Sequence, residues 1–225
     1  MTRTICAIHQ PNFFPWLGYF DKIRRADNFI ILDDVQYQKT GGSWSNRVAL
    51  NINANSQFFS APITRPSGLQ NINEVTFAPG NWRVKLLKTL QANYAKTSFF
   101  ELYKDFVFAL IENPEENIAA YNIHSIRELC TLFGIETPLV LSSSFGFETS
   151  SNQLLIDLTK ASGGNCYMAG GGAGGYQDMD LFAQQGIDFI YQDFSHPVYE
   201  QIKTPEFLPF LSILDYIFNV GVQPW

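Results

Sequence analysis

A histidine and two amides stand together in the stretch His9-Gln10-Pro11-Asn12. An imidazole, with an ordinary pKa of about 6.5, exchanges protons at neutral pH and can serve as a general base. The neighbouring amides of Gln10 and Asn12 can orient a polar substrate. The stretch therefore indicates a proton-transfer site. The alternative is a proline-stiffened turn whose His9 and Asn12 only satisfy loop backbone groups.

Two adjacent carboxylates, Asp33 and Asp34, follow the apolar run Phe29-Ile30-Ile31-Leu32. Neighbouring residues at a strand end point to opposite faces, so at most one of the two addresses the site directly. That one either orients His9 or holds a divalent cation, while the other caps a loop or pairs with Arg47. No metal site is assigned, because His9, His124 and His196 are scattered singly and the cysteines lack ligand spacing.

The polar stretch after these acids contains Gln36, Trp44, Asn46 and Arg47. A guanidinium offers a fork for phosphate or carboxylate, and an indole offers a stacking face for a base or a sugar. Arg47 is equally consistent with an ordinary ion pair at a strand edge.

A glycine-rich run, Gly170-Gly171-Gly172-Ala173-Gly174-Gly175-Tyr176, lies between an expected strand and an expected helix. Its bare backbone could approach an anion or an acyl carbonyl closely. The run matches neither of the common nucleotide-binding glycine motifs, and a flexible turn is the alternative. Farther on, His196 is either a plain loop histidine or shares a pocket with Tyr199.

The elements that must position these residues alternate between strand and helix. A buried strand over 4–8, a helix over 16–26 and the strand Phe29-Ile30-Ile31-Leu32 form a right-handed parallel crossover. This crossover places the His9 loop and Asp33-Asp34 on one rim of the sheet. Asp21, Lys22, Arg24 and Arg25 are expected on the solvated side of that helix.

The remaining elements complete an α/β fold with a Rossmann-like parallel sheet. A β-hairpin excursion is expected over 47–63, and a helical insertion or cap is expected over 78–135. The whole chain, residues 1–225, is expected to form one domain. A further short strand is expected over 74–77. Later strands are expected over 139–141, 165–169 and 188–191, with a last helix over 213–219.

Composition narrows the function classes. The chain has 225 residues, 46% of them hydrophobic, and a net charge of −6. General nucleic-acid binding is therefore not expected, although a tRNA donor stays open. Three widely spaced cysteines suit a reducing compartment. Neither a signal segment nor a membrane-spanning apolar run is seen, so a cytoplasmic location is expected.

The chain resembles the WbqC-like family of bacterial proteins. The resemblance rests on His9-Gln10-Pro11-Asn12, Leu32-Asp33-Asp34-Val35-Gln36 and His196-Pro197-Val198-Tyr199, together with residues 15–23, 26–27, 46–47, 93–94, 167, 170–175, 211–215 and 218–221. It implies a role in O-antigen or other surface-polysaccharide biosynthesis, with aminoacyl (glycine) transfer onto a sugar. The glycine loop is longer here than is usual in the family.

A looser likeness concerns the fold. The opening strand, loop and helix are similar to those of the cytidylyltransferase and pantothenate-synthetase superfamily. Those enzymes carry two histidines in this loop, where Trp16 and Tyr19 stand here. That departure speaks against ordinary nucleotidyl transfer.

These observations together predict a transferase that forms an amide or ester bond on an activated sugar. The alternatives are a nucleotidyl-transferring or adenylating enzyme and a non-catalytic sugar-nucleotide-binding protein. His9, Asp33 and Asp34 form the expected catalytic group. The expected substrate-binding residues are Gln10, Asn12, Trp16, Gln36, Trp44, Asn46, Arg47, Gly170, Gly171, Gly172, Gly174, Gly175, Tyr176, His196 and Tyr199. The residues name no cofactor, metal or oligomeric state; the expected partner is a nucleotide sugar or an activated acyl or aminoacyl donor.

Overall fold

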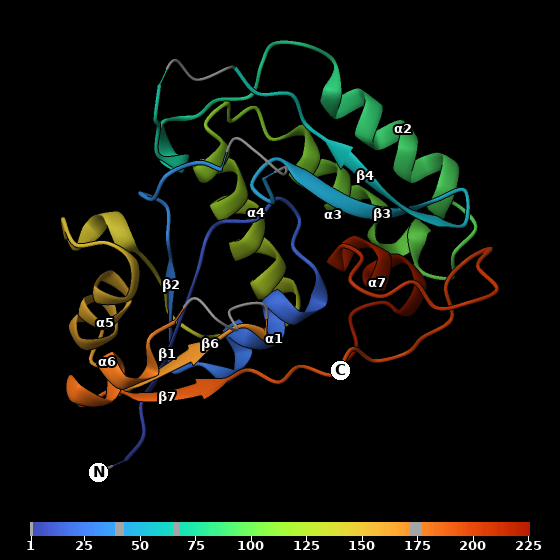
Figure 1. Ribbon diagram of the computed structural model, residues 1–225. Helices are drawn as coiled ribbons and strands as arrows, with labels where there is room; N and C mark the ends of the chain where they lie inside the picture. The colour runs from blue at the N-terminus through green and yellow to red at the C-terminus, as the bar shows by residue number, and fades with distance from the viewer. Residues whose placement is uncertain (1, 39–42, 65–67, 172–176) are drawn as a thin grey trace.

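A parallel sheet of five strands forms the centre of the computed structural model, which describes residues 2–38, 43–64, 68–171 and 177–225. The strands are β1 (Ile5–His9), β2 (Asn28–Ile31), β5 (Leu139–Leu141), β6 (Cys166–Ala169) and β7 (Asp188–Tyr191), in the spatial order β5-β2-β1-β6-β7 (Figure 1). The predicted α/β class with a parallel sheet is therefore confirmed.

The order of the strands creates a switch point beside β1. From β1 the chain builds outward through β2 and β5, and it then returns to the other side of β1 to add β6 and β7. Ile5 stands opposite Cys166 in β6, while Cys6 stands opposite Asn28 in β2. In open sheets of this kind, a crevice forms where the carboxyl ends of the two diverging strands part.

Helices cover both faces of the sheet, as the apolar strands require. α1 (Leu17–Arg25) and α4 (Ile118–Leu132) pack on one face, in a core shared with Ala7 and Phe29. α5 (Ser151–Ala161) and α6 (Met179–Gln184) cover the other face, against Ile8 and Ile30 (Figure 1). Alternate residues of each strand thus point into two different cores.

A second layer lies beyond α4. It contains the antiparallel hairpin of β3 (Arg47–Ile52) and β4 (Asn55–Ser60), with α2 (Trp82–Tyr94), α3 (Phe100–Glu112) and α7 (Ile213–Val220) packed beside it (Figure 1). The ring of Phe218 on α7 lies 5.5 Å from Tyr94 and 4.9 Å from Phe100. The large core on the α1 side of the sheet continues into this layer.

One expected strand, over 74–77, is replaced by a short turn of 3₁₀ helix, η1 (Ile72–Glu74). Asn71 and Glu74 form a capping box that ends the extended conformation, since each side chain satisfies the other residue's backbone N–H. Thr76 and Phe77 then form only isolated bridges.

Solvent exposure was predicted for four charged residues of α1, and the prediction is wrong for two of them. Arg24 and Arg25 are exposed, but Asp21 and Lys22 are only 6% and 3% exposed. Gln192, in the segment after β7, donates a hydrogen bond to Asp21 Oδ2 at 3.0 Å, and Lys22 Nζ donates to the Ile8 carbonyl of β1 at 2.8 Å. Two charged side chains of α1 therefore lie inside the molecule.

Within the described residues, no helix has the length and apolar character needed to cross a bilayer. Cys6, Cys130 and Cys166 are all buried free thiols, as their expected strand and helix positions predicted. Burial raises the pKa of the Cys6 thiol, which keeps it protonated and makes it a core residue rather than a nucleophile.

Candidate functional site

A cavity of about 510 Å³ opens at the switch point between β1 and β6. It receives side chains from four separate parts of the chain. Its lining residues are His9, Asn12, Trp16, Gly18, Tyr19, Lys22, Trp44, Gly170, Gly171, Gln192, Phe194 and Phe210. The volume is within the ordinary range of small-molecule sites, and the position is the one at which open α/β sheets bind ligands.

His9 is the last residue of β1 and reaches the cavity from the centre of the sheet. Its Nδ1 lies 3.1 Å from the carbonyl oxygen of Gln10, and the edge of the Tyr19 ring lies against the imidazole with centroids 4.9 Å apart. Because a carbonyl can only accept, Nδ1 carries the proton of the neutral ring. Nε2 is then left with the lone pair.

The surroundings of His9 keep its imidazole uncharged. Burial lowers its pKa from 6.5 to about 4, with a further contribution from the positive charge of Lys22, and the Gln10 carbonyl opposes this shift. A group with this pKa is neutral throughout the physiological range. The His9 ring is therefore a neutral imidazole in the folded protein.

Lys22 lies one turn after Tyr19 on α1, and its Nζ donates to the carbonyl oxygen of Ile8 at 2.8 Å. Burial lowers its pKa from 10.5 to about 8. No carboxylate in the described part of the chain lies within ion-pair distance of this ammonium, because the neighbouring Asp21 pairs instead with Arg24 and Arg25, at 3.3 and 3.5 Å.

Aromatic side chains form one wall of the cavity. The Trp16 indole stacks on His196, with centroids 6.2 Å apart, and meets Phe194 and Phe210 edge-on at 5.4 Å each. Trp44 is 46% exposed while lining the same cavity, so it offers a partly open indole face. Such a wall suits the flat face of a base or a sugar ring.

Backbone contacts bring the distant segments to this wall. The N–H of Phe13 donates to the Trp44 carbonyl at 2.8 Å, which fixes Trp44 beside the proline-rich loop. The N–H of Ile213 donates to the Pro15 carbonyl at 2.8 Å, and Ser212 bridges Trp16, so the segment carrying Phe210 is docked on the same loop. From the β7 side, Gln192 Nε2 donates to the Gly18 carbonyl at 2.7 Å.

Asp33 and Asp34 make their hydrogen bonds away from His9. Asp33 accepts hydrogen bonds from Ser142 Oγ at 3.1 Å and from Ser143 N and Oγ at 3.1 and 2.8 Å, and Asp34 also accepts from Ser142 Oγ. These bonds tie the end of β2 to η2 (Ser142–Ser144), which follows β5. The contacts on the His9 imidazole come from Gln10, Tyr19 and Lys22 instead.

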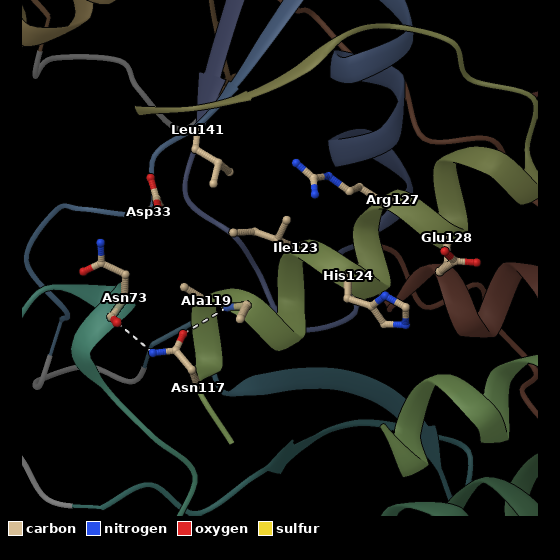
Figure 2. A pocket seen from close by; sticks show the side chains of 10 residues that line it. Asp33, Asn73, Asn117, Ala119, Ile123, His124, Arg127, Glu128 and Leu141 are labelled. Atoms are coloured by element: carbon tan, nitrogen blue, oxygen red, sulfur yellow. Dashed lines mark hydrogen bonds between the residues drawn. The ribbon is translucent and has the colours of Figure 1, made fainter. Parts of the chain in front are cut away.

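Asp33 lines a second cavity, of about 400 Å³, between the end of β2, η1 and α4 (Figure 2). Asn117 donates there to the Asn73 carbonyl at 2.7 Å and accepts from Ala120 N at 3.0 Å. His124 and Arg127 are exposed on the α4 side. The structure thus assigns His9 and Asp33 to different cavities.

Arg47, Asn46 and Gln36, three other predicted site residues, do not line the cavity. The Arg47 guanidinium lies over the rings of Trp44 and Phe58, at 5.1 and 4.3 Å. Asn46 accepts from the Tyr37 hydroxyl at 2.8 Å and donates to the Ala61 carbonyl at 2.8 Å. Gln36 is exposed and its backbone pairs with Asn71.

The glycine run is represented by Gly170 and Gly171, which line the cavity at the end of β6. Gly172, Gly174, Gly175 and Tyr176 lie outside the described residues.

His196 and Tyr199 stand behind the cavity wall. Their rings lie 6.1 Å apart, and Tyr199 donates to the buried carboxylate of Asp215 at 2.8 Å. Burial lowers the pKa of His196, and the Pro197 carbonyl and Asp215 oppose this shift. His196 stacks on Trp16, and Tyr199 lies behind His196.

Sequence reasoning missed five cavity-lining side chains: Tyr19, Lys22, Gln192, Phe194 and Phe210. Tyr19 and Lys22 are three residues apart on a helix and so share a face, a spacing that could have revealed them. Gln192 follows directly after an expected strand, where site residues gather. Phe194 and Phe210 carry no local signal, because only the tertiary fold brings them to Trp16.

Comparison with known proteins identifies the family of the chain. The model of the WbqC-like protein family matches residues 10–224. An uncharacterized protein of Mycobacterium tuberculosis (strain ATCC 25618 / H37Rv) is 30% identical over 220 residues, which cover 96% of this chain and 94% of the relative. No solved structure matches. The family match begins at Gln10, directly after His9, and continues beyond the end of α7, and the chain therefore belongs to the WbqC-like protein family.

Proposed function

We propose that this protein is a transferase that joins an acyl or aminoacyl group, such as glycyl, to an amine or hydroxyl of an activated sugar used in surface-polysaccharide (O-antigen) synthesis. One observation carries the proposal: a neutral imidazole, whose Nε2 makes no hydrogen bond to the described residues, stands in an aromatic-walled cavity at the switch point of the sheet. Three buried free thiols suit work in the reducing cytoplasm.

In the proposed reaction, His9 Nε2 takes the proton from the sugar amine or hydroxyl while that group attacks the acyl carbonyl carbon. The new carbon–nitrogen or carbon–oxygen bond forms as the bond to the donor's leaving group breaks, and the imidazolium returns its proton to that leaving group. The Gln10 carbonyl holds the Nδ1 proton, so the ring presents the same nitrogen throughout.

The cavity wall provides the positioning. Trp16 and Trp44 can stack on the sugar or on an attached base, and Asn12, only 6% exposed, can hydrogen-bond a substrate hydroxyl. Gly170 and Gly171 leave the end of β6 free of side chains, which allows close approach of a carbonyl or phosphate. Asp33 and Asp34 contribute by closing the β2–β5 end of the sheet.

The test is the turnover of the variant His9→Gln. Nucleotide-linked amino and hydroxy sugars would be incubated with acyl-CoA donors and glycyl-tRNA, and the acylated sugar would be measured by mass spectrometry. Loss of the base should lower kcat roughly 10²- to 10⁴-fold. His124→Gln, on the exposed side of α4, is the matched control and should retain full turnover. Equal turnover of His9→Gln and wild type would remove the base from the mechanism.

A nucleotidyl-transferring or adenylating enzyme is the second candidate, favoured by the same position of the cavity at the switch point. It requires a nucleoside triphosphate. A rise in melting temperature with ATP or CTP, together with release of pyrophosphate, would favour it over acyl transfer.

A further inference from the structure

We propose that the Lys22 ammonium binds a phosphate or diphosphate group of the substrate on the α1 side of the His9 cavity, so that the sugar arrives as a nucleoside diphosphate derivative. The inference rests on the proposed function, in that it specifies the substrate of the same site. It does not depend on which group is transferred.

The first support is the unsatisfied charge of Lys22. An ammonium has three N–H donors, and one of them is used by the Ile8 carbonyl at 2.8 Å. The side chain is only 3% exposed and lines the cavity, yet no ion pair among the described residues includes it. A buried cation without a counter-charge is costly, and an anionic ligand would remove that cost.

The second support is the absence of a competing negative charge on the described lining of the cavity. The titratable side chains that line it there are His9, Tyr19 and Lys22. Burial raises the pKa of Tyr19 well above its usual range and also raises the pKa of the nearby Cys6 thiol, so both groups are neutral. Asp21 is engaged by Gln192 and two arginines. The site is thus locally positive in a chain of net charge −6.

The third support is the shape of the cavity. The Lys22 ammonium sits beside the end of β1, at the Ile8 carbonyl, whereas Trp16 and Trp44 form an aromatic wall reached from the loops. A nucleoside diphosphate has the same division, since its base is flat and apolar and its diphosphate is charged. The end of β6, occupied by Gly170 and Gly171, adds backbone without side chains next to this site.

Binding of the anion would also prepare His9. The charge of Lys22 contributes to the lowered pKa of His9, so a bound phosphate that balances the charge should raise the pKa toward its ordinary value. An imidazole with a higher pKa is a stronger base. The substrate would thereby strengthen the base that acts on it.

The test is calorimetric binding of uridine, pyrophosphate and uridine diphosphate to the wild-type protein and to Lys22→Met. The inference predicts that both anions bind the wild type at least tenfold more tightly than they bind Lys22→Met. Uridine diphosphate should also bind more tightly than either uridine or pyrophosphate alone. Lys88→Met removes one exposed positive charge from α2 and should bind like the wild type. Equal anion affinity of Lys22→Met and wild type would overturn the inference, and equal affinity for pyrophosphate and uridine diphosphate would overturn its nucleoside part.

A second measurement needs no variant of Lys22. The ¹⁵N shifts of the His9 ring in wild-type protein would be followed against pH with and without pyrophosphate, and the pKa should rise when pyrophosphate is bound. An unmoved pKa of His9 at saturating pyrophosphate would also overturn the inference.

The variant His9→Gln distinguishes the two proposals, because it should lose turnover yet keep binding pyrophosphate. Turnover that survives in His9→Gln contradicts the transferase mechanism alone, whereas pyrophosphate binding that survives in Lys22→Met contradicts the anion site alone.

Discussion

The imidazole of His9 meets the Gln10 carbonyl, the edge of the Tyr19 ring and the charge of Lys22. Each contact acts on a different property of the base. The carbonyl decides which nitrogen carries the proton, and the ring lies against the imidazole. Burial is the main cause that disfavours the imidazolium, and the ammonium adds to it. A carboxylate partner would have done the reverse, by stabilising the charged form. His9 is thus neutral in the folded protein, the form that the proposed mechanism requires of a base.

The lowered pKa of His9 predicts a specific pH dependence of stability. Between pH 6.5 and about 4 the unfolded chain binds a proton on His9 and the folded protein does not, so stability falls as the pH falls through this window. Across this window, the titration of His9 lowers the free energy of unfolding by about 3 kcal/mol in total. Above pH 6.5 His9 makes no pH-dependent contribution. Lys22, with its pKa of about 8, changes stability only at higher pH, where stability rises as the pH rises.

Urea denaturation at several pH values would measure this effect. His9→Gln removes the titrating group, so its free energy of unfolding should decline less than that of the wild type between pH 6.5 and 4. Burial raises the pKa of Asp215, which gives both proteins the same opposite contribution, and this cancels in the comparison. Parallel curves for the two proteins would show that His9 does not titrate with a lowered pKa.

At the scale of the element, α1 places a tryptophan over a glycine. A Cβ atom at Gly18 would lie 2.2 to 2.6 Å from the Trp16 indole carbons, far inside van der Waals contact. The absence of a side chain at Gly18 is what allows the indole to fold back on the first turn of the helix. From there the indole reaches His196 and forms the cavity wall.

Gly18→Ala tests this packing, because helix propensity and sterics predict opposite signs. Alanine in a helix is favoured over glycine by about 1 kcal/mol, whereas overpacking costs about 1 to 3 kcal/mol. We expect a net loss of stability and weaker ligand binding. In a Trp16→Ala background the same change should become neutral or stabilising. Equal effects in the two backgrounds, measured by urea denaturation, would contradict the contact.

The same element shows what the sequence could and could not predict. The strands on either side of α1 were expected correctly because they are short, continuous apolar runs next to proline or acidic residues. Lys22 was assigned to solvent because a charged residue on an amphipathic helix is usually exposed. Lys22 is instead buried and donates to the Ile8 carbonyl of β1, a contact that cannot be read from the helix itself.

At the scale of the whole molecule, one fully buried amide joins the two layers. Asn122 on α4 donates to the Pro11 carbonyl at 2.9 Å and to the Ser45 carbonyl at 2.7 Å. It therefore clamps the loop after His9 and the segment next to Trp44. Through this amide, the helices between the hairpin and β5 help to set the spacing of the cavity wall.

Asn122→Ala should destabilise the fold by about 2 to 4 kcal/mol, because two buried carbonyl oxygens lose their donor. The change should also weaken ligand binding, since the His9 loop and the Trp44 segment would no longer be held together. His124→Ala, two residues farther on the same helix but exposed, should stay within about 0.5 kcal/mol of the wild type. Urea denaturation of both variants gives the comparison, and equal effects would exclude the clamp.

Prediction from sequence was weakest at this largest scale. The parallel sheet and the His9 rim followed from strand order and strand ends, which are local patterns joined by the crossover rule. The partners of His9 did not follow. Asp33 follows the strand next to β1 in the sheet, yet its carboxylate accepts hydrogen bonds from the serines after β5, a contact that no spacing along the chain reveals.

The position of β1 has a consequence for synthesis of the protein. Ile5 pairs with Cys166, so the strand in the middle of the sheet acquires its second neighbour only after most of the chain has left the ribosome. Until then the nascent chain exposes the apolar side of β1 that α5 and α6 later cover. Because exposed apolar surface promotes aggregation, truncation before β6 should yield an aggregating fragment rather than a smaller folded unit.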